Sequence, residues 1–152
     1  MKKTIATAVI TAIVTAAIAI ACFAGCSKKS VKQTATVYLD QEENSVEATI
    51  DLSDGYSCEF TRGAIYLFDK SDGDAVAIAM TLEQDAYDDY AAAAGSASDR
   101  KDINGGVMFS ADGKTIYICT VGDSAYFAIF ADKATTAQME KYIARFNVVP
   151  ES

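Results

Sequence analysis

The sequence contains no histidine and no tryptophan, and it has one proline in 152 residues. Histidine titrates near neutral pH without help, and it is the commonest general base and metal ligand. Its absence excludes Ser-His-Asp and Cys-His catalysis and histidine-ligated zinc or haem. The Walker A, G-x-G-x-x-G, G-x-S-x-G and C-x-x-C patterns are also missing. We therefore expect a protein that is not an enzyme and has no cofactor, although composition leaves carboxylate-only hydrolysis open.

Acidic residues are missing from the first part of the chain, where none precedes Asp40. Residues 4–25 hold only apolar, Thr, Cys and Gly side chains. The part from Asp40 onward contains all 21 acidic residues and only eight basic residues, which gives it a net charge of −13. A domain with this negative charge repels phosphate backbones, so nucleic acid is excluded as a partner. Cations or basic protein surfaces are compatible with it.

The N-terminus reads as an export signal, because Lys2 and Lys3 precede a long apolar segment. The segment ends in Phe23-Ala24-Gly25-Cys26, followed by the polar run SKKS. This motif resembles the bacterial lipoprotein signal, in which small residues precede a cysteine that is acylated and becomes the mature N-terminus. Phe23 departs from the leucine-like residue that the family prefers. The resemblance implies a lipid such as palmitate on Cys26 and anchoring to the outer face of the cytoplasmic membrane, or to an outer membrane where one exists.

Two alternatives to this cleavage remain open. Cys22 ends a second match to the motif, Ala19-Ile20-Ala21-Cys22, but apolar residues follow it. The other alternative is that the apolar segment 4–25 is not cleaved and forms a membrane-spanning helix, since about 20 apolar residues span a bilayer. Lys28, Lys29 and Lys32 would then lie outside, against the positive-inside tendency. We expect a signal peptide over 1–25, a lipidated cysteine and polar spacer over 26–36, and one domain over 37–152.

The domain is dominated by a period of two with frequent turn signals, which is typical of antiparallel strands. Two helices interrupt the strands, one from Thr81 to about Ala94 and one starting near Thr135. Each start carries a T-x-x-Q capping box, with Gln84 and Gln138 in the third position. The sequence predicts an α+β domain with an antiparallel sheet of about seven strands and two packed helices. The expected strands are 45–52, 56–60, 64–68, 75–80, 106–110, 114–121 and 124–131.

Four of these segments, 64–68, 75–80, 114–121 and 124–131, are apolar on both faces, so we expect both faces of each to be covered. The order of elements over residues 45–147 resembles the PsbP-like fold of the photosystem extrinsic proteins and related small bacterial domains. This resemblance rests on element order and carries no functional residue.

Cys58 and Cys119 are the cysteines that remain after processing, and both lie in expected strands. Export permits oxidation, so a disulfide between them is one interpretation. The alternative is a pair of buried thiols that act as small apolar side chains.

Three charged segments are candidate contacts. The DKSDGD loop offers Asp69, Asp72 and Asp74 as oxygen ligands for Ca²⁺, although it lacks the EF-hand spacing and also fits an ordinary turn. The first helix begins with a carboxylate cluster that suits either solvent or a basic partner. The loop after this helix holds two cations in an acidic body. These residues are Glu83, Asp85, Asp88, Asp89, Arg100 and Lys101.

We therefore expect an exported, membrane-anchored interaction module for a protein partner. A small-ligand or cation-binding module is the alternative, and a carboxylate-dependent hydrolase is the third candidate.

Overall fold

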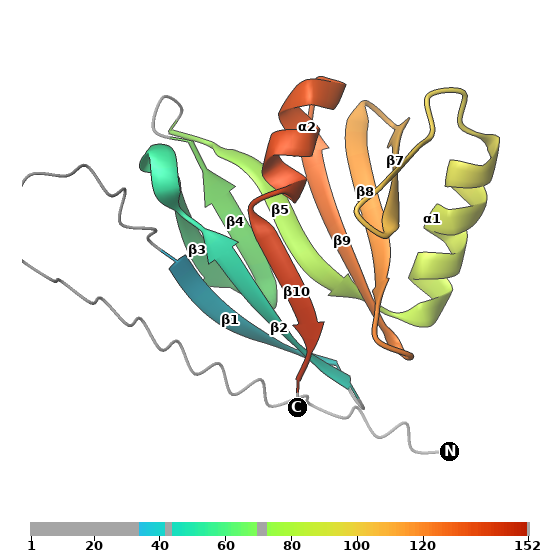
Figure 1. Ribbon diagram of the computed structural model, residues 1–152. Coiled ribbons are helices and arrows are strands. Elements are labelled where there is room, and N and C mark those ends of the chain that lie inside the picture. The colour runs from blue at the N-terminus through green and yellow to red at the C-terminus, as the bar shows by residue number, and fades with distance from the viewer. Residues whose placement is uncertain (1–33, 42–43, 70–72, 152) are drawn as a thin grey trace, which may run out of the picture.

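The computed structural model describes residues 34–41, 44–69 and 73–151. Ten strands and two α-helices follow one another in these residues, with one 3-10 turn (Figure 1). They are β1 Thr34–Gln41, β2 Asn44–Asp51, η1 Ser53–Gly55, β3 Ser57–Thr61, β4 Ala64–Phe68, β5 Ala75–Leu82, α1 Gln84–Ser96, β6 Lys101–Ile103, β7 Gly106–Ala111, β8 Lys114–Val121, β9 Ala125–Asp132, α2 Thr136–Ile143 and β10 Phe146–Pro150.

The strands form two antiparallel sheets. The larger has seven strands in the order β3-β4-β5-β9-β8-β7-β6, and the smaller has three in the order β1-β2-β10. The prediction of an α+β domain with a seven-stranded antiparallel sheet and two helices is confirmed. The prediction that 45–52 belongs to that sheet is wrong, because β2 pairs with β1 and β10 instead.

The main core lies between the two sheets. Val46, Ala48 and Ile50 of β2 are fully buried, as their alternation predicts. They share one cluster with side chains of the seven-stranded sheet, such as Ile65 and Ile129, and with Met139 of α2. The smaller sheet and α2 therefore cover the same face of the larger sheet, which we call the inner face.

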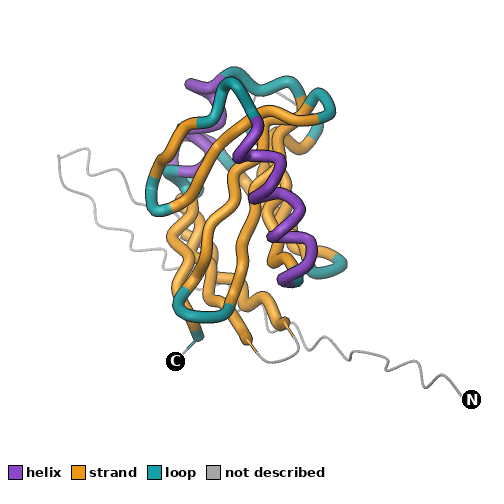
Figure 2. Tube along the Cα trace, turned by 90° about the vertical axis from the view of Figure 1, so that its right-hand side faces the viewer, coloured by secondary structure: helices purple, strands orange, loops and turns teal. Residues whose placement is uncertain are grey.

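Helix α1 lies on the opposite face, which we call the outer face, at the end of the sheet away from β3 and β4 (Figures 1 and 2). Ala86, Tyr90, Ala93 and Ala94 of α1 pack in a second, smaller core cluster. That cluster comes from β5, β7, β8 and β9, so α1 covers only part of this face. Within the described residues, no helix is long and apolar enough to cross a membrane.

The two helix starts differ from each other. Thr135 caps α2 with a reciprocal capping box to Gln138, as predicted. Thr81 does not cap α1, because β5 continues through it to Leu82 in register with β9. The N-cap of α1 is Glu83, whose side chain makes no capping hydrogen bond. The pairing of β5 with β9 thus overrides a local helix signal.

Two tight turns connect β6 to β7 and β7 to β8. Asn104-Gly105 and Asp112-Gly113 have positive φ at both residues, the conformation of the two-residue hairpin turns that favour Asn-Gly and Asp-Gly. The first of these turns lets Lys101–Ile103 pair with β7 as the short strand β6, in a segment that the sequence predicts as a loop.

Both ends of the described domain lie in the smaller sheet. Residues 34–36, which were expected in the spacer, begin β1 and pair with Asp51, Ile50 and Thr49. Phe146 continues the helical spacing of Met139, Tyr142 and Ile143, but it begins β10. The small sheet is therefore built from the first two strands and the last.

Candidate functional site

The outer face of the seven-stranded sheet is only half covered. Tyr66 and Phe68 of β4 and Ile78 of β5 point to this face and are partly buried, but they belong to neither core cluster. Within the described residues, α1 is the helix on this face, and it packs with side chains of β5, β7, β8 and β9. The sequence predicts that strands 64–68 and 75–80 are covered on both faces. This prediction is wrong for the outer face.

A groove runs where the bare part of the sheet meets α1. Its floor includes Ile78, Met80 and Phe130, and its helical wall is formed by Ala86 and Tyr90. The cavity volume is about 430 Å³. The rings of Tyr90 and Phe130 lie 5.5 Å apart at 60°, an edge-to-face arrangement that holds this wall on the floor.

Carboxylates border the groove on the helix side. Glu83, Asp85, Asp88 and Asp89 are all exposed. The helical repeat puts Asp85 and Asp89 on the groove side of α1 and Asp88 on the other side. No ion pair of these four is found within 34–41, 44–69 and 73–151. The groove is therefore apolar at its floor and bordered by carboxylates on the helix side, and Asp112 and Lys114 also take part in its lining.

A second hollow lies on the inner face, between β8 and β10. Its volume is about 330 Å³, and its lining includes Tyr117, Cys119, Phe146 and Val148. The Tyr117 hydroxyl donates a hydrogen bond to the carbonyl of Asn104 at 3.0 Å. Burial raises the pKa of the Tyr117 phenol and of the Cys119 thiol, and for Cys119 the contact with Tyr117 opposes this in part. Both groups are therefore uncharged at neutral pH.

Cys58 and Cys119 are free thiols, so the disulfide interpretation is wrong. Cys58 lies in β3 and Cys119 in β8, four strand steps apart in the sheet. At roughly 4.8 Å per step, this separation is about 19 Å, whereas a disulfide needs Cα atoms within about 7 Å. Burial raises the pKa of Cys58, as it does that of Cys119. Both act as small apolar side chains at the edge of the inter-sheet core.

The acidic loop is described only in part. Asp69 is partly buried at the end of β4 and Asp74 is exposed, while Asp72 lies outside the described residues. Among the residues that are described, no group of three or more Cys, Asp or Glu side chains is placed to hold a metal ion. Cys22 and Cys26 also lie outside the described residues.

The two cations after α1 have acidic neighbours. Arg100 contacts Asp102 at 3.2 Å, and Lys101 forms an ion pair with Glu140 of α2. Lys101 therefore ties β6 to α2 across the inner face, and Arg100 stays largely exposed. The structure does not bring these cations together with the carboxylates of α1 in a common site.

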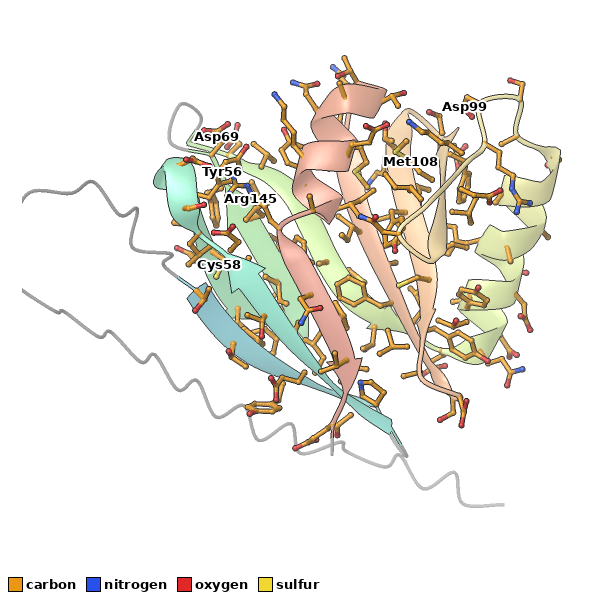
Figure 3. The ribbon with its side chains drawn as sticks, in the orientation of Figure 1. Tyr56, Cys58, Asp69, Asp99, Met108 and Arg145 are labelled. Atoms are coloured by element: carbon orange, nitrogen blue, oxygen red, sulfur yellow. The ribbon has the colours of Figure 1, made fainter. Side chains whose placement is uncertain are left out.

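Arg145 makes a set of side-chain contacts that the sequence did not predict. Its Nη1 donates to the carbonyls of Asp51 and Ser53 at 3.1 and 2.8 Å, and its Nη2 lies 3.1 Å from Oδ2 of Asp54. Its guanidinium carbon stacks 3.6 Å from the centre of the Tyr56 ring. Figure 3 places Arg145, Tyr56, Cys58 and Asp69 at the same end of the molecule. These hydrogen bonds hold the 3-10 turn η1 in place, so the role of Arg145 is structural. We call this set of contacts the Arg145 lock.

No protein-family model, curated protein or solved structure matches this chain. The outer groove and the inner hollow are therefore the two candidate binding sites of the described residues.

Proposed function

We propose that the protein is an exported bacterial lipoprotein whose domain binds a partner protein through the outer groove. A lipid on Cys26 holds it at the outer face of the cytoplasmic membrane, or at an outer membrane. This part of the proposal rests on the motif Phe23-Ala24-Gly25-Cys26 and its context. With two or more acyl chains, at about 0.8 kcal/mol per buried methylene, such an anchor is stable.

The bare outer face is the observation that carries the binding role. Tyr66, Phe68 and Ile78 lie on this face, are partly exposed and belong to neither core cluster. A contiguous apolar surface beside a groove is typical of interaction sites. Because α1 already fills the other half of the face, a partner segment laid beside it would complete the layer.

Charge points to the chemistry of the partner. The rim carries Asp85 and Asp89, and the body as a whole has a net charge of −13. Complementary potentials speed association and select partners. The groove therefore suits a basic amphipathic segment, with apolar side chains toward Ile78 and Met80 and Lys or Arg toward α1. The PsbP-like order of elements remains a prediction and contributes no residue to this site.

Photo-crosslinking in the host cell tests the docking surface in the intact lipidated protein. A crosslinking amino acid replaces Tyr66 on the bare face or, as the matched control, Tyr38 in β1 of the smaller sheet. We expect the probe at Tyr66 to capture a discrete protein that the probe at Tyr38 does not. The same products at both positions, or none at Tyr66, would contradict the docking surface.

Charge reversal on α1 tests the rim. Asp89→Lys is expected to reduce the Tyr66 crosslink strongly, because it places a cation where the partner's basic side chains approach. Asp88→Lys makes the same change on the other side of the helix and should have a much smaller effect. Equal loss in both variants would show that net charge, rather than the groove, controls binding.

A further inference from the structure

The inner hollow lies beside a free strand edge. Among the strands of the described residues, β10 is an edge strand of the smaller sheet and pairs with β2 alone. The N–H of Asp51 donates to the carbonyl of Arg145 at 2.8 Å, and the N–H of Glu151 to the carbonyl of Ser45 at 2.9 Å. Hydrogen-bonded pairs alternate in an antiparallel ladder, so Arg145, Asn147, Val149 and Glu151 turn their backbone groups toward β2.

The same alternation turns the N–H and C=O groups of Phe146 and Val148 away from β2. Pro150 is the next residue on this free side, and proline has no N–H to offer. Pro150 also packs on the turn after β8, where a Cβ on Gly122 would lie 2.8 Å from its Cγ. The free edge is therefore short, with donors at Phe146 and Val148 and a proline at its end.

The hollow next to this edge has the size and polarity to receive a side chain. Phe146, Asn147 and Val148 line one side, and the Asn104-Gly105 turn and β8 line the other. Its walls include the apolar Phe127, Ile129 and Ile143. No Asp, Glu, Lys or Arg takes part in the lining. A charged side chain would lose its hydration here without gaining a partner.

We propose that β10 binds an extended, uncharged peptide segment as an additional strand, and that the hollow takes one of its apolar side chains. In such strand addition, backbone hydrogen bonds supply affinity and pockets for alternate side chains supply selectivity. The site lies on the opposite face of the seven-stranded sheet from the outer groove. It depends neither on that groove nor on the lipid anchor.

Selection from a library of short random peptides, with the domain as the target, tests the inference. Binders are expected to carry an apolar residue flanked by uncharged ones. Bound peptide should shift the amide resonances of Phe146 and Val148 and slow their hydrogen exchange. A selection that returns no binder, or binders whose shifts lie elsewhere, would overturn the proposal.

Backbone methylation separates strand addition from side-chain binding. A selected peptide is made in two forms, each N-methylated at every second residue, in the two alternating phases. One form should bind and the other should not, because only one edge of the added strand faces β10. Binding of both forms, or of neither, contradicts the proposal.

Substitutions in β10 supply the protein-side control. Val148→Pro removes the central free N–H while leaving the bonds to β2, and it should abolish peptide binding. Val149→Ala changes an exposed side chain whose backbone groups face β2, and it should bind the peptide within a few-fold of the original chain. If Val148→Pro fails to fold, the methylated peptides still decide the question; a folded Val148→Pro that binds normally refutes it.

Discussion

At the scale of single residues, Arg145 has the largest set of long-range contacts described for any side chain. It follows α2 in the chain, yet it bonds to Asp51, Ser53 and Asp54, more than 90 positions earlier. A planar guanidinium can donate to two carbonyls and stack on Tyr56 at the same time, which an ammonium cannot do. The 3-10 turn therefore depends on the identity of this side chain as well as on its charge.

We expect Arg145→Lys to lower the free energy of unfolding by about 1–3 kcal/mol, because charge-assisted hydrogen bonds to partly buried groups are lost. Urea unfolding followed by circular dichroism measures the change. Arg62→Lys makes the same substitution at an exposed residue of the turn between β3 and β4, and it should leave the midpoint unchanged. Equal effects in the two variants would contradict the Arg145 lock.

At the scale of elements, α2 is short and strongly capped, whereas α1 is longer and starts without a side-chain cap. The Thr135 hydroxyl accepts from the N–H of Gln138, and the Gln138 side chain accepts from the N–H of Thr135. An eight-residue helix is marginal by itself. Its capping box and the burial of Met139, Tyr142 and Ile143 are what stabilise it.

Thr135→Ala is expected to cost about 1 kcal/mol of stability, the usual effect of removing an N-cap hydroxyl. Thr136→Ala, at the first helical position, leaves the capping box intact and serves as the control. Denaturant unfolding measures both variants. A loss at Thr136 as large as that at Thr135 would show that the effect comes from composition and not from the cap.

At the scale of the whole molecule, the seven-stranded sheet presents two unequal faces. The smaller sheet and α2 cover its inner face, and α1 covers part of its outer face (Figure 1). The outer groove and the free edge of β10 therefore lie on opposite sides, so two ligands have no shared surface to compete for. We therefore expect the two proposed ligands to bind without competing.

The tether itself is tested by metabolic labelling with palmitate in the host. Cys26→Ala should abolish labelling and release the protein from membranes, because no acceptor for the acyl chains remains. Cys22→Ala should keep both, since we place Cys22 in the removed signal peptide. The reverse pattern would move the anchor to Cys22, and membrane retention without label in Cys26→Ala would favour the uncleaved helix.

The sequence by itself determined most of the local elements. The period of two identified the buried faces of β2 and β3, and the T-x-x-Q box identified the start of α2. Each of these signals lies within a few neighbouring residues, where hydrophobic periodicity and capping act directly. The proposed lipid anchor also rests on a local signal, because a signal motif is read as a linear sequence.

Only the tertiary structure decided which strands share a sheet. Strand β2 does not belong to the larger sheet and pairs instead with β10 from the other end of the domain. Strand β5 continues through Thr81, the residue whose sequence context resembles a helix cap. The tertiary structure also left Tyr66 and Phe68 of β4 and Ile78 of β5 outside both core clusters, and it placed Cys58 and Cys119 four strand steps apart. Strand pairing depends on contacts between residues distant in the chain, and an apolar strand carries the same local pattern whether a helix, a second sheet or a partner covers it.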